Sequence, residues 1–226
     1  MDYQEFYEKF MTHFEKEDKE NSVNTVMQIV SGREIDIIDL YTKILTPALY
    51  SIAGDNLEQK ITISQEHIRT SIIRTIIECC YPYVVVERNL NYTIKKENRK
   101  KVIILCPEDE YHEIGPRMVE DFFTLNHYEP IFLGGNTPRE DLMTLIEEIK
   151  PEYIAVSVAN YYNIVTAKKM VEKMKAQLSY TPKVIVGGYA IRKKKESKNE
   201  LGVDYILDTF EDIQALARED YGDVFS

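Results

Sequence analysis

Apolar residues recur at helical spacing through residues 1–90, where no segment shows the strict alternation of a half-buried strand. The spacing predicts helices near residues 2–17, 22–30, 35–52 and 62–86. Pro47 predicts a kink or a break in the third helix, because proline lacks the backbone N–H that continues a helix. Thr62 and Gln65 fit a capping box, which makes Thr62 the expected first residue of the fourth helix. We therefore predict an all-helical bundle over residues 1–90.

The pattern changes after a polar stretch, residues 91–99, which we interpret as a linker. Beyond it, continuous apolar runs of strand length alternate with stretches of helical spacing. Such runs are typical of parallel strands that are covered on both faces. The runs are 101–106, 130–133, 153–157, 183–186 and 205–207, and the helical stretches are 112–126, 138–149, 163–178, 190–201 and 210–219. This order predicts an α/β domain over residues 100–226, with a five-stranded parallel, Rossmann-like (flavodoxin-like) sheet.

Composition narrows the classes of partner. The net charge of −10 disfavours direct binding to nucleic acid or to an anionic membrane. No apolar run approaches the roughly 20 residues that a membrane span needs, and the amino-terminal segment lacks the pattern of a signal peptide. Three cysteines are too few for a disulfide framework and fit a reducing, cytoplasmic environment. We expect the adjacent Cys79 and Cys80 to be buried apolar residues.

The loop after the first strand carries the most informative histidine. Ligands of open parallel sheets bind at the carboxyl ends of the strands, which is where His112 falls. Glu110, two residues earlier, can accept a proton from one ring nitrogen, which fixes the tautomer of an imidazole that binds a metal. Gly115 would let a bulky group approach the backbone. Taken alone, the pattern fits a solvated histidine in an acidic loop equally well.

Other strands of the predicted sheet end in residues that suit a ligand edge. The third strand ends in Ser157 and the fourth in Gly187-Gly188, a pair without side chains where a flat or elongated ligand could lie. The second strand ends in a glycine-rich turn, with Thr137 as the expected N-cap of the next helix. Each of these features has an ordinary explanation in turn chemistry, but their occurrence on successive strands favours one binding edge.

The phrases Glu110-x-His112-x-x-Gly115, Ser157-Val-Ala159 and Gly187-Gly188 resemble the signature of cobalamin (vitamin B12)-binding domains. The resemblance covers the carboxyl-terminal half of the chain. It implies that His112 is the lower axial ligand of cobalt and that the displaced nucleotide base and its tail enter a slot beside Ser157, Ala159, Gly187 and Gly188. Two residues depart from the pattern. Glu110 replaces an aspartate, and Ala159 stands where leucine or threonine is usual.

The amino-terminal half resembles the helical module that caps cobalamin in the same family. The pair Glu66-His67 is similar to a pair in cobalamin-dependent, light-sensing regulators, where it faces the upper axial ligand. Those regulators carry a tryptophan about ten residues earlier, and this chain contains no tryptophan. The alternative for Glu66 is an acidic residue placed where the helix dipole favours it. The resemblance implies a cofactor bound between the two domains, base-off and His-on.

Three functions follow from these observations. The first is a cobalamin-binding sensor or regulatory module that acts through a protein partner or through oligomerisation. It is favoured because methyl carriers continue as Gly-Lys-Asn-Ile, whereas Gly115 is followed here by Pro116-Arg117-Met118. The second is a corrinoid methyl carrier that serves methyltransferase partners. The third is an interaction domain without a cofactor. In each case we expect a binding or carrier protein and not a complete enzyme.

Overall fold

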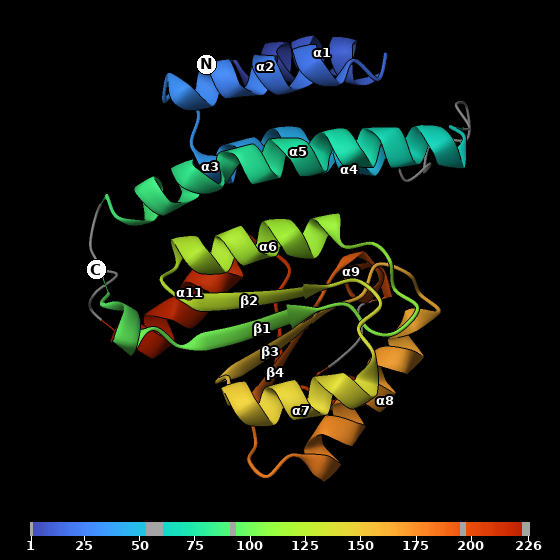
Figure 1. Ribbon diagram of the computed structural model, residues 1–226, viewed down its shortest axis with the longest axis vertical. Helices are drawn as coiled ribbons and strands as arrows, with labels where there is room; N and C mark the ends of the chain where they lie inside the picture. Colours follow the sequence, from blue (N-terminus) through green and yellow to red (C-terminus); the bar gives the residue numbers. More distant parts are fainter. Residues whose placement is uncertain (1, 53–60, 91–93, 195–197, 223–226) are drawn as a thin grey trace. The chain divides into compact units, whose positions relative to one another are not determined.

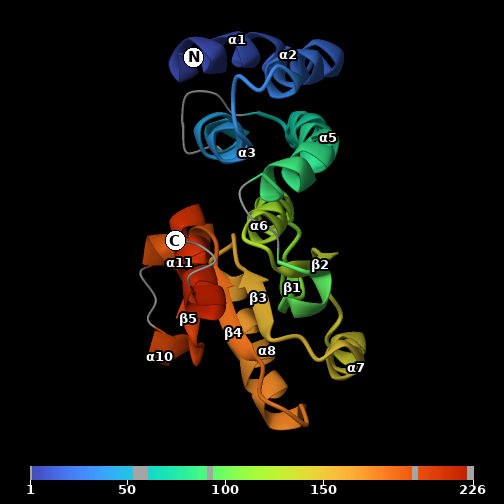
Figure 2. The ribbon, with the colours of Figure 1, turned by 90° about the vertical axis from the view of Figure 1, so that its left-hand side faces the viewer.

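The structure, a computed structural model, describes residues 2–52, 61–90, 94–194 and 198–222. The chain divides into two compact units, Met1–Leu90 and Asn91–Ser226 (Figures 1 and 2). Across the described ranges, no helix is both long enough and apolar enough to span a membrane.

The amino-terminal unit is entirely helical in its described residues. Helices α1, α2 and α3 begin after Asp2, Asp18 and Asp36, whose carboxylates accept hydrogen bonds from the first-turn N–H groups. Thr62 and Gln65 form the predicted capping box at the start of the longest helix. The elements are α1 (Tyr3–Phe14), α2 (Lys19–Ser31), α3 (Ile37–Asp39), η1 (Leu40–Leu45), α4 (Thr46–Ile52) and α5 (Ile63–Arg88).

The third predicted helix, in which we expected a kink or a break at Pro47, is not broken there. A π-helical turn, η1, precedes the proline, and α4 continues from it. The N–H of Thr46 donates to the carbonyl of Tyr41, five residues back. A wider turn at this point moves the preceding carbonyls away from the proline ring, so that the helical path survives. Pro82 also lies inside α5 without ending it.

The core of the helical unit is made by one apolar stripe from each helix. α2 packs against α1 and α5, and the rings of Phe10 and Phe14 stack with their centroids 5.2 Å apart. Cys80 is buried in this core, but Cys79 is exposed, so the expectation that both are buried was half wrong. The two positions are adjacent on a helix, and adjacent helical residues point about 100° apart.

The carboxyl-terminal unit holds a five-stranded parallel sheet in the order β2-β1-β3-β4-β5. Its strands are β1 (Lys101–Leu105), β2 (Glu129–Gly134), β3 (Tyr153–Ser157), β4 (Lys183–Gly187) and β5 (Tyr205–Ile206). They confirm the predicted fold class of a helical region followed by a parallel α/β sheet. The order changes direction between β1 and β3, and ligands bind beside such a switch point in open α/β sheets.

Helices cover both faces of this sheet, α6 and α11 one face and α7 and α8 the other (Figures 1 and 2). The described helical elements of the unit are η2 (Lys96–Asn98), α6 (Ile114–Leu125), α7 (Arg139–Ile149), α8 (Asn163–Gln177), α9 (Tyr189–Lys194), α10 (Lys198–Leu201) and α11 (Phe210–Tyr221). The stretch 190–201, predicted as one helix, contains α9 and α10, and residues 195–197 lie outside the described ranges.

Thr137 is not the N-cap of α7, contrary to our expectation. Pro138 holds that position without a side-chain hydrogen bond. The hydroxyl of Thr137 donates instead to the carbonyl of Gly134, 3.3 Å away, so it stabilises the turn after β2 and not the helix. Side-chain hydrogen bonds of this local kind compete with capping, and the structure of the turn decides between them.

Candidate functional site

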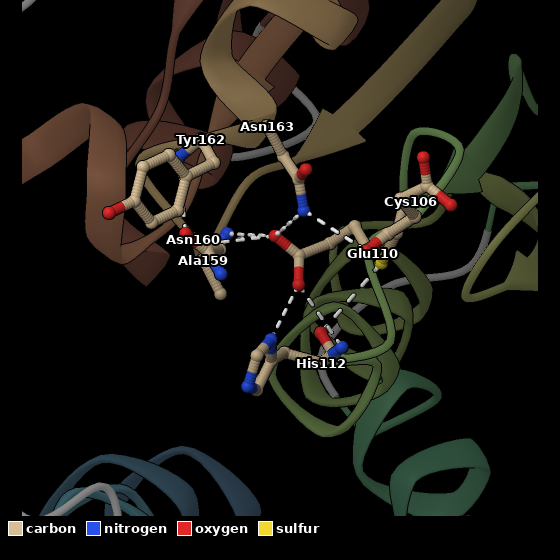
Figure 3. A network of polar contacts seen from close by, with 8 residues as sticks. Cys106, Glu110, His112, Ala159, Asn160, Tyr162 and Asn163 are labelled. Atoms are coloured by element: carbon tan, nitrogen blue, oxygen red, sulfur yellow. Dashed lines mark hydrogen bonds and ion pairs between the residues drawn. The ribbon is translucent and has the colours of Figure 1, made fainter.

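Two loops meet at the switch point of the sheet. One follows β1 and carries Glu110 and His112, and the other follows β3 and carries Asn160 (Figure 3). β1 and β3 are neighbouring parallel strands, so their carboxyl ends lie at the same edge. The fold therefore brings together residues that are about fifty positions apart in the sequence.

Glu110 lies at the centre of this arrangement, and it is 1% exposed. Its Oε2 accepts hydrogen bonds from the backbone N–H of Ala159 at 3.1 Å, the backbone N–H of Asn160 at 2.8 Å and the side-chain amide of Asn163 at 3.1 Å. Its Oε1 faces His112, with the backbone N–H 3.3 Å away and ring nitrogen Nδ1 2.5 Å away. A buried carboxylate needs such partners, because an unpaired one is costly to remove from water.

These donors keep Glu110 ionised. Burial by itself would raise the pKa of this carboxyl group. The hydrogen bond to His112, the N–H of Asn160 and the amide of Asn163 outweigh burial and lower the pKa to about 2. An ionised carboxylate can only accept, so the proton between the two groups belongs to Nδ1 of His112. In the neutral imidazole, this assignment leaves Nε2 as the ring nitrogen with a lone pair.

His112 presents its ring at the surface of the unit. The side chain is 59% exposed, although the Glu110 that holds it is buried. Figure 3 shows the ring turned away from the asparagines of the β3 loop, with one nitrogen directed at Glu110. A carboxylate that orients one nitrogen and leaves the other outward is the usual arrangement around a histidine that ligates a metal. Gly115, in the first turn of α6, has open space on its Cβ side.

Asn160 and Asn163 were not predicted as site residues. Asn163 begins α8, is buried, and donates from its side chain both to Glu110 and to the carbonyl of Asp109. The side chain of Asn160 accepts the N–H of Tyr162, which shapes the loop whose N–H groups reach Glu110. The available signal was two asparagines directly after a strand that ends at the ligand edge. Nothing in their spacing pointed to Glu110.

The glycine pair has a structural role in the packing of the chain, and its predicted role beside a ligand stays a prediction. A Cβ on Gly187 would lie 2.4 Å from the carbonyl oxygen of Leu207, and a Cβ on Gly188 would lie 2.6 Å from that of Val158. Gly188 also has φ +105°, a conformation that other residues rarely adopt. Close packing of the chain against itself therefore requires both glycines. Ser157 is the register partner of Gly187, so the predicted slot residues of β3 and β4 are adjacent.

The loop after β2 closes the other side of the site. The N–H of Gly135 donates to Glu113 at 2.9 Å, and the N–H of Asn136 donates to the carbonyl of Glu110 at 2.8 Å. Cys106, at the end of β1, is buried. Burial raises the pKa of its thiol to about 12, with Glu110 and Glu113 adding to the shift, so this cysteine stays a neutral thiol.

Glu66 and His67 belong to the first turn of α5 in the helical unit. Glu66 is half-buried and His67 is exposed. Glu66 stands where the helix dipole favours an acidic side chain. Contact of this pair with the cofactor stays a prediction.

Comparison with known proteins identifies the family. The B12 binding domain family matches residues 100–217, which is more than half of the chain. The chain belongs to this family. A corrinoid protein of Desulfitobacterium hafniense strain Y51 is 26% identical over 127 residues, which are 56% of this B12-binding chain and 58% of that relative. The match thus spans just over half the length of each protein.

A solved structure shares the fold of this B12-binding protein. The monomethylamine corrinoid protein of Methanosarcina barkeri aligns with a TM-score of 0.78 over 96% of this chain and 98% of that chain. The two sequences are 16% identical, so the likeness concerns the fold. The family and the curated relative confirm the predicted cofactor, cobalamin.

The residues at the carboxyl edge suit this cofactor. The cofactor would bring most of the ligands of its cobalt with it, and a protein imidazole could take the place of its nucleotide base. His112 provides an exposed imidazole whose other nitrogen is already held by Glu110. Ser157 and Gly187 are register partners at the ends of β3 and β4, and Gly115 has open space on its Cβ side, so the residues at these positions are small.

Proposed function

We propose that this B12-binding protein is a corrinoid methyl carrier, in which His112 is the lower axial ligand of cobalamin. The observation that carries the proposal is the pair of an exposed imidazole and a buried, ionised glutamate at the switch point of the sheet, 2.5 Å apart. The cofactor supplies a cobalt centre that can receive a methyl group from one methyltransferase and give it to another. The protein supplies the axial ligand, its orientation and the binding slot.

Each predicted site residue has a part in this proposal. Glu110 holds the proton of Nδ1, so Nε2 of His112 is the nitrogen that would bind cobalt. Ser157, Ala159, Gly187 and Gly188 would line the slot for the displaced base and its tail, and Gly115 would allow close approach. The helical unit, residues 1–90, would cap the cofactor, with Glu66 and His67 towards its upper face.

The methyl carrier has better support than the sensor that the sequence analysis placed first. The curated relative is named as a corrinoid protein, and the solved structure of the same fold is named as the corrinoid protein for monomethylamine. The absence of a Gly-Lys-Asn-Ile continuation after Gly115 was the argument for a sensor. Gly115 and the residues after it form the first turns of α6, whereas the partners of Glu110 come from the loops after β1 and β3 and from Asn163. The proposed ligand pair is therefore compatible with a different continuation after Gly115.

Cofactor binding tests the first half of the proposal. The purified chain, mixed with hydroxocobalamin, should keep a red chromophore through gel filtration. Electron paramagnetic resonance of the cobalt(II) form should show coupling to one histidine nitrogen, and the splitting should change with ¹⁵N-histidine. His112→Ala should remove that coupling, whereas His13→Ala, which alters a histidine of α1, should keep it. A colourless protein after reconstitution, or unchanged coupling in His112→Ala, would overturn the proposal.

Methyl transfer tests the second half. The reduced, cobalamin-loaded protein should acquire the visible spectrum of methylcobalamin when it is mixed with a methyltransferase encoded beside its gene and the methyl donor of that enzyme. A sensor would behave differently. Its oligomeric state would change with light or with the upper ligand, and it would not accept the methyl group. Analytical ultracentrifugation in the dark and in light separates these outcomes.

A further inference from the structure

Positive charge is concentrated in one part of an acidic chain. Residues 161–198 contain ten lysines and arginines and two glutamates, whereas the rest of the chain contains 18 basic and 36 acidic residues. A random distribution would give this segment a negative charge like that of the whole. Basic runs are usually solvated faces without further meaning, so their arrangement in the fold decides whether they form one surface.

The structure gathers part of this charge beside exposed aromatic residues. The ammonium group of Lys194 on α9 lies 5.8 Å from the ring centroid of Tyr161, which precedes α8, and that of Lys193 lies 5.4 Å from the ring of Tyr189. The ring centroids of Tyr161 and Tyr189 are 6.3 Å apart, so the start of α8 and the start of α9 are linked by this pair of rings. Lys168 is exposed one turn along α8 from Val165. We call the residues Tyr161, Tyr162, Val165, Lys168, Lys193 and Lys194 the basic surface.

This surface combines charge with exposed apolar area. Tyr162 is 88% exposed, Val165 60% and Tyr161 40%. Large exposed aromatic side chains beside cations are typical of protein interfaces, where tyrosine forms the centre and charged residues form the rim. The neighbouring Arg192 pairs with Asp208 at 3.6 Å, so part of the charge is compensated inside the unit. Lys193 and Lys194 of the basic surface lie over aromatic rings, which leave their positive charge in place.

The basic surface is connected to the candidate cofactor site through one loop. The N–H of Asn160 donates to Glu110, and its side chain accepts the N–H of Tyr162. The residues that fix Glu110 and the most exposed tyrosine of the basic surface are therefore within three positions of each other. A molecule that docks on the basic surface lies beside the carboxyl edge of the sheet.

We propose that the basic surface docks an acidic face of a protein partner. This inference rests on the proposed function, because a methyl carrier needs methyltransferases to reach the edge that holds its cofactor. Charge complementarity favours a carboxylate-rich protein surface. Nucleic acid is disfavoured because the remaining chain, with twice as many acidic as basic residues, repels a polyanion as long as DNA over many ångströms.

A charge-reversal experiment tests this docking. The probe is a fluorescein-labelled deca-glutamate peptide, and its binding to the full chain reconstituted with hydroxocobalamin is followed by fluorescence anisotropy. The test variant is Lys193→Glu/Lys194→Glu. The matched control is Lys95→Glu/Lys96→Glu, which reverses an adjacent, exposed lysine pair away from the basic surface and changes the net charge equally. We expect the test variant to weaken binding about tenfold and the control by less than about twofold. Added salt should weaken peptide binding to the wild type more steeply than peptide binding to the test variant.

Four results would overturn the inference. The first is failure of the peptide to bind the wild type, and the second is an equal loss of binding in both variants. A deca-thymidine oligonucleotide that binds more tightly than the peptide, and that the test variant loses, would assign the surface to nucleic acid. A concentration-dependent dimer that the test variant abolishes would assign it to a second copy of the chain. The visible spectrum of each variant reports cobalamin binding separately, so failure of the cofactor proposal is distinguished from failure of the docking proposal.

Discussion

Glu110→Gln is the substitution that tests the candidate site most directly. The three donors at Oε2 require an oxygen there, so the amide oxygen of glutamine must face Ala159, Asn160 and Asn163. The amide NH₂ must then face His112, where the carboxylate accepted both the backbone N–H and Nδ1–H. The amide NH₂ group would then face two donors of His112, its backbone N–H and its Nδ1–H. The imidazole can become an acceptor at Nδ1 only by moving that proton to Nε2. The substitution should therefore cost stability and cofactor ligation together.

The size of the stability loss follows from the pKa. The pKa of Glu110 is about 2 in the folded protein against an ordinary value of 4.5. At about 1.36 kcal/mol per unit, the folded environment favours the ionised form by roughly 3 kcal/mol. Because the folded-state pKa is the lower one, this contribution is present above pH 4.5. It decreases as the pH falls from about 4.5 to about 2. Glutamine cannot ionise, so the variant lacks this contribution to stability at every pH.

The assay compares urea unfolding of wild type and Glu110→Gln at several values of pH, followed by far-ultraviolet circular dichroism. The free energies of unfolding should differ by about 3 kcal/mol at pH 7, and the difference should shrink as the pH approaches 3. Glu172→Gln, on the exposed side of α8, is the control and should change stability by less than about 0.5 kcal/mol. A difference that stays constant between pH 7 and pH 3 would refute the assignment of an ionised, hydrogen-bonded Glu110.

Three further predictions follow from other parts of the structure. Gly188→Ala should destabilise the α/β unit by roughly 3 kcal/mol, because φ is +105° and the added Cβ would lie 2.6 Å from a backbone oxygen. A melting temperature within a degree of the wild-type value would contradict this. Asp220→Ala should lower the free energy of unfolding by about 3 kcal/mol, because this carboxylate accepts hydrogen bonds from the hydroxyls of Tyr128 at 2.7 Å and Tyr153 at 2.9 Å. Tyr128→Phe should lower it by only about 1 kcal/mol. Equal losses for the two variants in urea unfolding would exclude the shared acceptor. Thiol labelling of the native protein at pH 8 should modify the exposed Cys79 rapidly and spare Cys106, whose pKa of about 12 keeps it protonated. Rapid labelling of Cys106, detected by mass spectrometry, would show instead that the end of β1 is open to solvent.

The sequence by itself determined the order of the elements and the edge that carries the site. Continuous apolar runs located all five strands. The signal is clearest for the central strands β1, β3 and β4, because a strand covered on both faces leaves little choice of residue. The capping box at Thr62 was readable because its partners are three residues apart. His112 and Glu110 were found for the same reason, since they are two residues apart and their pairing is local.

Only the tertiary structure decided what surrounds that pair. Besides the nearby His112, the donors to Glu110 come from the loop after β3 and the start of α8, 49 to 53 positions away. The glycines at the end of β4 are required by backbone that follows β3 and β5. Likewise, the lysines of α9 form one surface with tyrosines of the β3 loop only because β3 and β4 are neighbours in the sheet. Local hydrogen bonds and periodicity involve residues that are close in the sequence, so they can be predicted from it. Burial and long-range partners depend on how the chain packs.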